Sequence, residues 1–164
     1  MNLKRTVQIL KNKKQTYHLK IPGKTENLEL IRTFVSRLAQ MSGFDEDDIY
    51  KIELAVDEAC ANVIKHAYEG KGKKEIDLLL EIDYKKLTII VTDEGVGFDV
   101  NNILKRDMKE YLGQMKVGGL GIHLIMSLMD DVKLKSKPGE KTEVRMTKYL
   151  VKDGKIKSKQ VDDG

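Results

Sequence analysis

The stretch DEACANVIKHAY, residues 57–68, decides the fold because it completes the longest helical pattern in the chain. Apolar residues recur at helical spacing from Ile49 onward, which indicates one amphipathic helix. The acidic run at 45–48 suits its start, because the unpaired N–H groups at a helix N-terminus carry partial positive charge. Gly70 ends the pattern, so we expect a helix over about 45–68.

One face of this helix carries a chemically useful line of polar residues. Glu58 and Asn62 are four residues apart, so they lie one turn apart on the same face, and His66 continues the line. A carboxylate can take a proton from an attacking hydroxyl. An amide oxygen suits Mg²⁺ held mainly by phosphates and water. The alternative is a plain solvated helix face, which such spacing also produces.

A second segment, TDEGVGF at 92–98, directly follows the apolar run LTIIVT at 87–92. That run is continuous enough to predict a central buried strand. Asp93 then stands at the strand end, where Gly95 and Gly97 release the backbone into a tight turn. A carboxylate there can accept a hydrogen bond from an exocyclic amine, and the glycines let a flat ring approach. The alternative is an ordinary Asp-Gly turn.

The third segment is VGGLG at 117–121, which runs into a predicted helix. A glycine-rich loop at a helix start presents N–H groups and the positive dipole end to an anion, so it predicts a phosphate cradle. It is not a Walker loop, since no Gly-Lys-Ser/Thr follows, and its spacing does not fit a dinucleotide fingerprint. A flexible loop with a glycine at the helix start is the alternative.

The remaining pattern is that of a mixed α and β chain. We expect strands at 7–10, 16–21, 76–82, 87–92, 132–136 and 142–149, and helices at 26–41, about 45–68 and about 119–129. These elements predict a single domain over residues 1–150. The segment 151–164 is polar and is expected to be a tail.

Composition narrows the class of protein. The 164 residues are 40% hydrophobic and 34% charged, which is typical of a soluble globular domain. No apolar run approaches the roughly 20 residues that span a bilayer, and the N-terminus lacks the pattern of a secretory signal. The single cysteine, Cys60, excludes an intramolecular disulfide framework and a multi-cysteine zinc site. We therefore expect a cytoplasmic protein.

Positive charge gathers at the two ends of the chain. Residues 1–24 carry seven basic residues and no acidic one, and residues 132–160 carry ten basic and three acidic residues. Such ends suit nucleic acid or an acidic protein surface. They lack the interleaved aromatic residues of a single-strand binder, which favours solvated strands and a lysine-rich tail.

The three segments, together with KTEV at 141–144, follow one another in an order that resembles the Bergerat-fold (GHKL) ATPases. Gyrase, MutL, the ninety-kilodalton heat-shock chaperone and histidine kinases share this fold. Within that superfamily the chain is most similar to the bacterial anti-sigma-factor serine/threonine kinases. The resemblance covers about residues 26–149. It implies an α+β (α/β) two-layer sandwich whose mixed, mostly antiparallel sheet has helices on one face.

The resemblance also implies roles for individual residues. Asn62 would hold Mg²⁺ against the triphosphate, and Glu58 would orient or deprotonate the attacking hydroxyl. Asp93 would accept a hydrogen bond from the adenine amino group, with Thr142 behind it. Residues 98–117 would form a lid over ATP. The further nucleotide-binding candidates are His66, Gly95, Gly97, Lys116, Gly118, Gly119, Leu120 and Gly121. Family members often carry an arginine close to the second glycine segment, whereas the nearby cation here is Lys116, and a lysine lacks the planar fork of a guanidinium.

The activity implied by the resemblance is ATP-dependent phosphorylation of a serine on an anti-sigma-factor antagonist, alternating with sequestration of a sigma factor. ATP or ADP and Mg²⁺ would be the cofactors, and a homodimer is the family precedent. Neither direct nucleic-acid binding nor a membrane is expected. The alternative is an ATP-binding module that sequesters a transcription factor without kinase activity.

Overall fold

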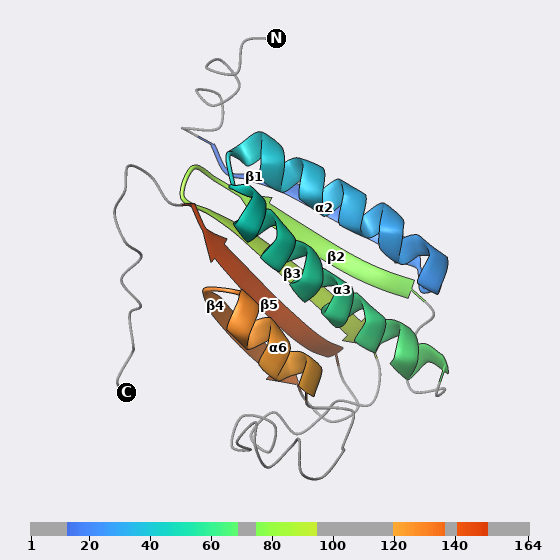
Figure 1. The fold of residues 1–164 in the computed structure, drawn as a ribbon. Coiled ribbons are helices and arrows are strands. Elements are labelled where there is room, and N and C mark those ends of the chain that lie inside the picture. Colours follow the sequence, from blue (N-terminus) through green and yellow to red (C-terminus); the bar gives the residue numbers. More distant parts are fainter. Residues whose placement is uncertain (1–12, 69–74, 95–119, 137–140, 151–164) are drawn as a thin grey trace.

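The computed structural model describes residues 13–68, 75–94, 120–136 and 141–150 (Figure 1). In chain order the elements are β1 (Gln15–Pro22), the 3₁₀ turn η1 (Thr25–Asn27), α2 (Leu28–Ser42), α3 (Glu46–Tyr68), β2 (Glu75–Ile82), β3 (Lys86–Glu94), α6 (Leu120–Leu128), β4 (Asp131–Ser136) and β5 (Lys141–Tyr149). The expected elements from residue 16 onward are confirmed within a few residues. The strand expected at 7–10 and the tail at 151–164 lie outside the described residues.

The sheet has the strand order β1-β2-β3-β5-β4, and every pairing among these described strands is antiparallel. β3 is the central strand and is buried from Leu87 through Val91. The prediction of a central buried strand at 87–92 is therefore confirmed. Side chains on both faces of β3 are buried in this stretch, the polar Thr88 among them, so its sequence does not alternate between apolar and polar residues.

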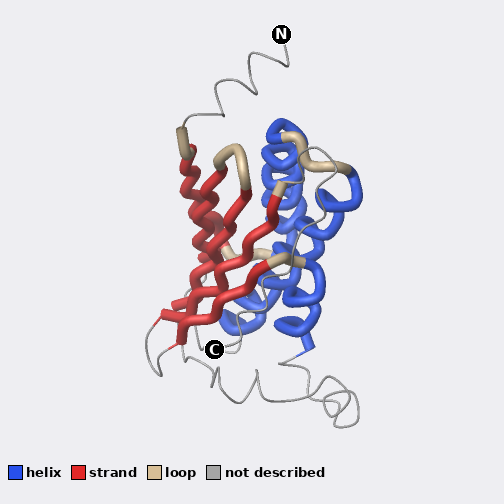
Figure 2. The backbone as a smooth tube through the Cα atoms, turned by 90° about the vertical axis from the view of Figure 1, so that its left-hand side faces the viewer, coloured by secondary structure: helices blue, strands red, loops and turns tan. Residues whose placement is uncertain are grey.

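The helices α2, α3 and α6 cover the same face of the sheet, so the molecule has two layers (Figures 1 and 2). The core lies between the layers. Its largest fully buried side chains include Ile31 of α2, Ile52 of α3, Ile125 of α6 and Ile89 and Met146 of the sheet. The expected two-layer α+β sandwich with helices on one face is confirmed.

The helix α2 ends at Ser42, one residue beyond the end expected from the sequence, and Gly43 follows it. This glycine has a φ of 99°, in the left-handed region that favours glycine. Its backbone N–H reaches the carbonyl oxygens of Ala39 and Gln40, which satisfies the last turn of the helix. The chain can then turn and start α3 antiparallel to α2.

The helix α3 owes its start and its position to two patterns in the sequence. Oδ1 of Asp45 accepts a hydrogen bond of 2.8 Å from the backbone N–H of Asp48, which caps the first turn. Farther along, a stripe of apolar side chains is buried. The stripe consists of Ile52, Ala55, Val56, Ala59, Cys60, Val63 and Ile64. This stripe fixes which face of α3 is left for polar chemistry.

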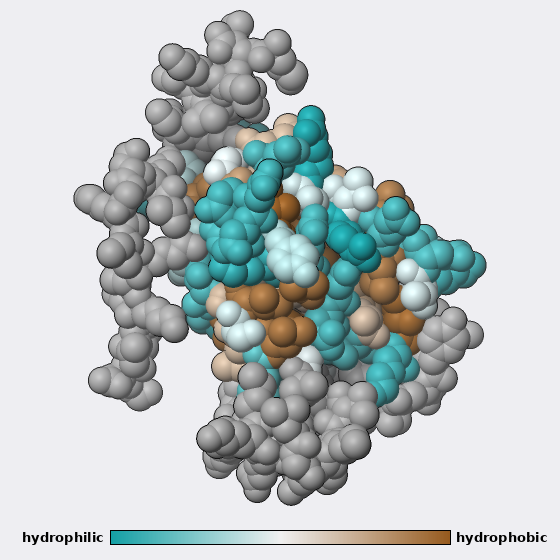
Figure 3. Space-filling model, viewed as in Figure 1, coloured by the Kyte–Doolittle hydropathy of each residue, from teal (hydrophilic) through white to brown (hydrophobic). Residues whose placement is uncertain are grey.

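Hydrophilic side chains cover much of the helix-bearing face, with hydrophobic patches between them (Figure 3). One patch lies over α6, where Leu124 and Met126 are exposed. Within the described ranges, the helices include none that is both long and apolar enough to cross a membrane.

Candidate functional site

Glu58 and Gly121, which come from two different sequence segments, meet at the contact between α3 and α6. The carboxyl group of Glu58 on α3 packs directly against the backbone of Gly121 in the first turn of α6. A Cβ atom placed on Gly121 would lie 2.9 Å from the carboxyl carbon of Glu58 and closer still to its Oε1 atom. Glycine is therefore the only residue type at position 121 that leaves the side chain of Glu58 where it is.

Asn62 lies one turn farther along α3 and is partly buried, as Glu58 is. Both residues stand beside the buried stripe, so they are held by a rigid helix rather than by a loop. His66 belongs to the last turns of α3, and its side chain lies outside the described part of the structure. Of the three polar residues expected along one face of α3, the structure describes the side chains of Glu58 and Asn62.

Asp93 on β3 and Thr142 on β5 lie opposite one another on two paired strands. Asp93 stands near the end of β3, its register partner on β5 is Thr142, and both are buried. Oγ1 of Thr142 lies 3.0 Å from the hydroxyl oxygen of Ser136 on β4. The expectation that Thr142 lies behind Asp93 agrees with this register. Their contact with adenine stays a prediction.

The ends of the elements that carry these residues lie at one edge of the fold (Figure 1). β3 ends there, β5 and α6 begin there, and the C-terminal half of α3 runs over it. At this edge the ammonium of Lys141 lies 3.3 Å from Oε1 of Glu94. Asp93 and Thr142 stand near the ends of their strands at this edge, and Gly121 stands near the start of α6 in contact with Glu58. Four candidate residues from both layers thus come from elements that meet at one edge of the fold.

The other candidates are not placed. The predicted site residues Gly95, Gly97, Lys116, Gly118 and Gly119 lie outside the described residues, as does the lid expected at 98–117. Leu120 opens α6, but its side chain is not described. Their roles remain predictions.

Asp57, the neighbour of Glu58, has a structural role that the sequence pattern did not reveal. Successive residues on a helix point about 100° apart, so Asp57 faces α2 while Glu58 faces α6. Oδ2 of Asp57 lies 3.0 Å from Nε of Arg32, and the pair links the two helices. No local signal in the sequence distinguishes this carboxylate from its neighbour, because only the packing of α2 against α3 does so.

Cys60 is buried in the core beside this site. Burial raises the pKa of its thiol from 9.0 to about 12, and the charge of Asp57 adds to the rise. The thiol therefore stays neutral at physiological pH. A raised pKa of this kind is typical of an inert structural cysteine rather than a nucleophile.

We expect the Cys60 thiol of the native protein to resist a disulfide reagent at pH 8 and to react fully after unfolding in urea. The unfolded thiol loses its proton at a lower pH than the folded one, so the free energy of unfolding should also fall as the pH rises from 9.0 toward about 12. Absorbance of the released thiolate measures the first effect, and urea titrations at several pH values measure the second. Rapid modification of the folded protein would contradict the assignment.

Residues 21–148 match the family model of the histidine kinase-like ATPase domain, which is the class of protein that this fold and site define. Among individual proteins, the serine-protein kinase RsbW of Bacillus velezensis is 36% identical over 137 residues, covering 80% of this chain and 84% of that protein. RsbW of Bacillus thuringiensis is 35% identical over 139 residues, covering 82% and 85%. The chain thus belongs to the histidine kinase-like ATPase family, in the branch of the serine-protein kinases RsbW. The family expected from the sequence is confirmed.

The described residues fit an ATP site whose metal ion would be held by Asn62 together with phosphate oxygens and water. Within the described ranges, His, Cys, Asp and Glu side chains form no group of three or more that would hold a metal. Asn62 supplies a neutral oxygen, which suits Mg²⁺ whose other ligands are phosphate oxygens and water. Gly121 carries no side chain at the start of α6, and the carboxyl end of Glu58 occupies the space that a side chain there would take.

Proposed function

We propose that this protein is a cytoplasmic kinase that transfers the γ-phosphoryl group of ATP to a serine of an anti-sigma-factor antagonist and otherwise sequesters a sigma factor. The contact between Glu58 and Gly121 carries the proposal, because it brings the expected base to the helix start that is expected to hold the phosphates. The names of the relatives, which are serine-protein kinases, support the same activity.

In the proposed reaction each residue binds, orients or moves a proton. Mg²⁺ held by Asn62 supplies charge neutralisation at the phosphates when it is bound. Asp93, supported by Thr142, accepts a hydrogen bond from the adenine amino group. The backbone N–H groups at the start of α6 attract the phosphates through the positive end of the helix dipole. Glu58 accepts the proton of the serine hydroxyl. Positioning of the reactants and electrostatic stabilisation supply most of the rate enhancement.

The proposal extends to regulation by nucleotide state. ATP and ADP differ by the γ-phosphate, so the lid expected at 98–117 would contact them differently. A partner that binds beside this lid would then have different affinities for the two states. Sequestration of a sigma factor and phosphorylation of its antagonist become alternative outcomes of one site.

Transfer is tested directly by incubating the pure protein with radiolabelled ATP, Mg²⁺ and candidate antagonist proteins. A phosphoserine on one antagonist, located by mass spectrometry, is the expected result. Tight sigma-factor binding without transfer would overturn the proposed kinase activity. It would favour an ATP-binding module that sequesters a transcription factor without phosphorylating any antagonist. A DNA affinity that falls steeply with salt and ignores ATP would instead favour the basic ends as a nucleic-acid interface.

Substituting Asn62 tests the metal assignment. We expect Asn62→Ala to reduce the affinity for ATP in the presence of Mg²⁺ by more than about tenfold, or about 1.4 kcal/mol. Affinity measured with EDTA should change much less, since that binding lacks the metal. Titration calorimetry in both buffers gives the comparison. An unchanged affinity with Mg²⁺ would rule out Asn62 as the ligand.

Substituting Gly121 tests the contact that carries the proposal. The added methyl group of Gly121→Ala collides with the carboxyl end of Glu58, which is partly exposed and can rotate away. We therefore expect a small loss of stability and a loss of transfer of about 10²-fold, which is the scale of a misplacement by about 1 Å. Urea unfolding and initial rates measure the two effects. Transfer at the original rate would show that the position of Glu58 is unimportant.

A further inference from the structure

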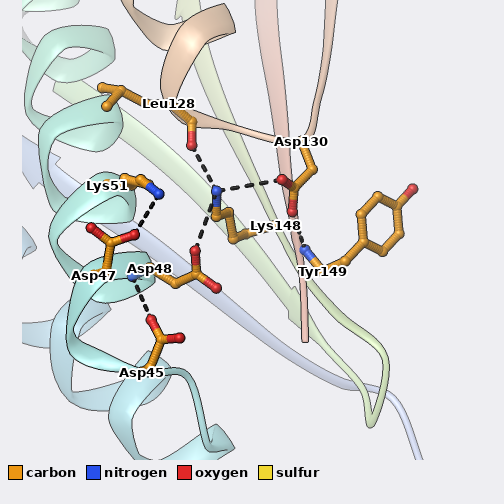
Figure 4. Close-up of polar contacts among 8 residues, drawn as sticks. All are labelled: Asp45, Asp47, Asp48, Lys51, Leu128, Asp130, Lys148 and Tyr149. Atoms are coloured by element: carbon orange, nitrogen blue, oxygen red, sulfur yellow. Dashed lines mark hydrogen bonds and ion pairs between the residues drawn. The ribbon is translucent and has the colours of Figure 1, made fainter. Parts of the chain in front are cut away.

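Lys148 near the end of β5 is a buried charge outside the nucleotide site. Its side chain is 5% exposed, and it faces the helices. Its ammonium donates a hydrogen bond of 2.8 Å to the carbonyl oxygen of Leu128 (Figure 4). Oδ1 of Asp130 lies 3.4 Å away and Oδ1 of Asp48 lies 3.5 Å away. A single amine thus binds groups from three parts of the fold.

The partners of Lys148 are the ends of two helices. Leu128 is the last residue of α6, whose final carbonyl groups lack partners within the helix. α6 has no basic residue in its last turn, so the cation that complements its dipole comes from β5. Asp48 belongs to the first turn of α3, where it is buried. Lys148 therefore ties the C-terminal end of α6 to the N-terminal end of α3.

The same two helices meet again at the candidate site. Glu58 is ten residues beyond Asp48, or about 15 Å along α3. Gly121 is seven residues before Leu128, or about 10 Å along α6. Lys148 with its partners Leu128, Asp130 and Asp48 joins α3 and α6 at one end of the helix pair. The contact between Glu58 and Gly121 joins the same two helices farther along, at the start of α6.

Directional contacts beside the apolar packing fix the C-terminal end of α6. The backbone N–H of Asp130, two residues beyond the helix, donates a hydrogen bond of 3.0 Å to the carbonyl oxygen of Thr147. The buried residues Ile122 and Ile125 of α6 contribute non-directional attraction, which changes little when a helix slides or rotates slightly. The hydrogen bond from Lys148 to the carbonyl oxygen of Leu128 also has a fixed length and direction, so it adds a directional constraint on the last turn of the helix itself. A displacement at this end is transmitted along the short helix to Gly121.

We infer that Lys148 is a positioning residue for phosphoryl transfer. By fixing α6 to the first turn of α3, it sets the place of Gly121 and of the phosphate-binding helix start relative to Glu58. The inference rests on the proposed function. Because a displacement of about 1 Å at a reacting group costs about 10²-fold in rate, a small movement of α6 is enough to matter.

If Lys148 only stabilised the fold, restoring stability would also restore kcat, and a double variant tests this. Lys148→Met removes the amine but leaves Asp48 as a buried charge, so the single variant is also destabilised. Lys148→Met/Asp48→Asn removes that charge as well and is expected to recover stability, while Leu128 still lacks its donor. We expect its kcat to fall about 10²-fold and its KM for ATP to stay within about twofold. Recovery of kcat together with stability would overturn the inference.

The anchoring of α6 is also measurable without any transfer. In hydrogen exchange followed by mass spectrometry, the double variant should exchange faster than wild type over residues 120–128 and equally over 75–82. Lys133→Met, which removes an exposed lysine of β4, is the matched control and should change neither. Unchanged exchange over 120–128 would overturn the inference. If wild type phosphorylated no antagonist, the proposed function would fail, while the exchange result would still decide whether Lys148 anchors α6.

Discussion

Glu58→Gln is expected to bind ATP as wild type does and to transfer the phosphoryl group about 10²–10⁴ times more slowly. Glutamine keeps the size and the hydrogen-bonding reach of the side chain but cannot take a proton from the serine hydroxyl. Packing against Gly121 should survive the substitution, because the two side chains have nearly the same shape. The loss should therefore appear in kcat, with little change in the affinity for ATP.

Initial rates at saturating ATP and antagonist, with calorimetry for nucleotide binding, provide the measurement. Glu53→Gln is the matched control, since it makes the same change on the same helix and Glu53 lies outside the site. A loss smaller than about tenfold would assign Glu58 to orientation, because a loose phosphoryl-transfer transition state needs little help from a base.

Lys148→Met should lower the free energy of unfolding by about 3–5 kcal/mol, which is the cost of breaking a buried ion pair from one side. The substitution leaves the carboxylate of Asp48 buried without its nearby cation and takes the donor from the carbonyl oxygen of Leu128. Such a loss is a large fraction of the stability of a domain of this size. Asp48→Asn in the same chain should restore much of it.

Urea unfolding followed by circular dichroism measures this effect. Lys14→Met is the control, because Lys14 forms an exposed ion pair of 2.9 Å with Glu81, and such pairs contribute about 0–1 kcal/mol. If the free energy of unfolding fell by the same small amount in both variants, the buried position of Lys148 would have no energetic consequence.

The elements of the fold were predictable from the sequence because each has a local cause. The apolar period of α3 and the acidic run before it predicted a helix at about 45–68, and the structure has it at Glu46–Tyr68. The unbroken apolar run at 87–92 predicted the central strand. The apolar spacing over 26–41 predicted the helix that the structure has at Leu28–Ser42. In each case the signal lies within a few residues of the feature.

The candidate site was predictable only in part. Spacing along one helix placed Glu58 and Asn62 on one face, and the order of the glycine segments pointed to a nucleotide. The sequence does not show that Glu58 touches Gly121, nor that Asp57 turns toward Arg32 instead. These contacts join separate helices, so they depend on how the helices pack.

By itself the sequence determined the family, the order of the helices and strands, and the residue types able to bind a nucleotide, because periodicity, capping and glycine placement act over short distances along the chain. Only the tertiary structure decided which of those residues meet. It set Asp93 opposite Thr142 by strand register and brought Lys148 to a carbonyl group 20 residues away. The physical reason is that a buried charge or a bare backbone position acquires its role from partners that the packing of the two layers supplies.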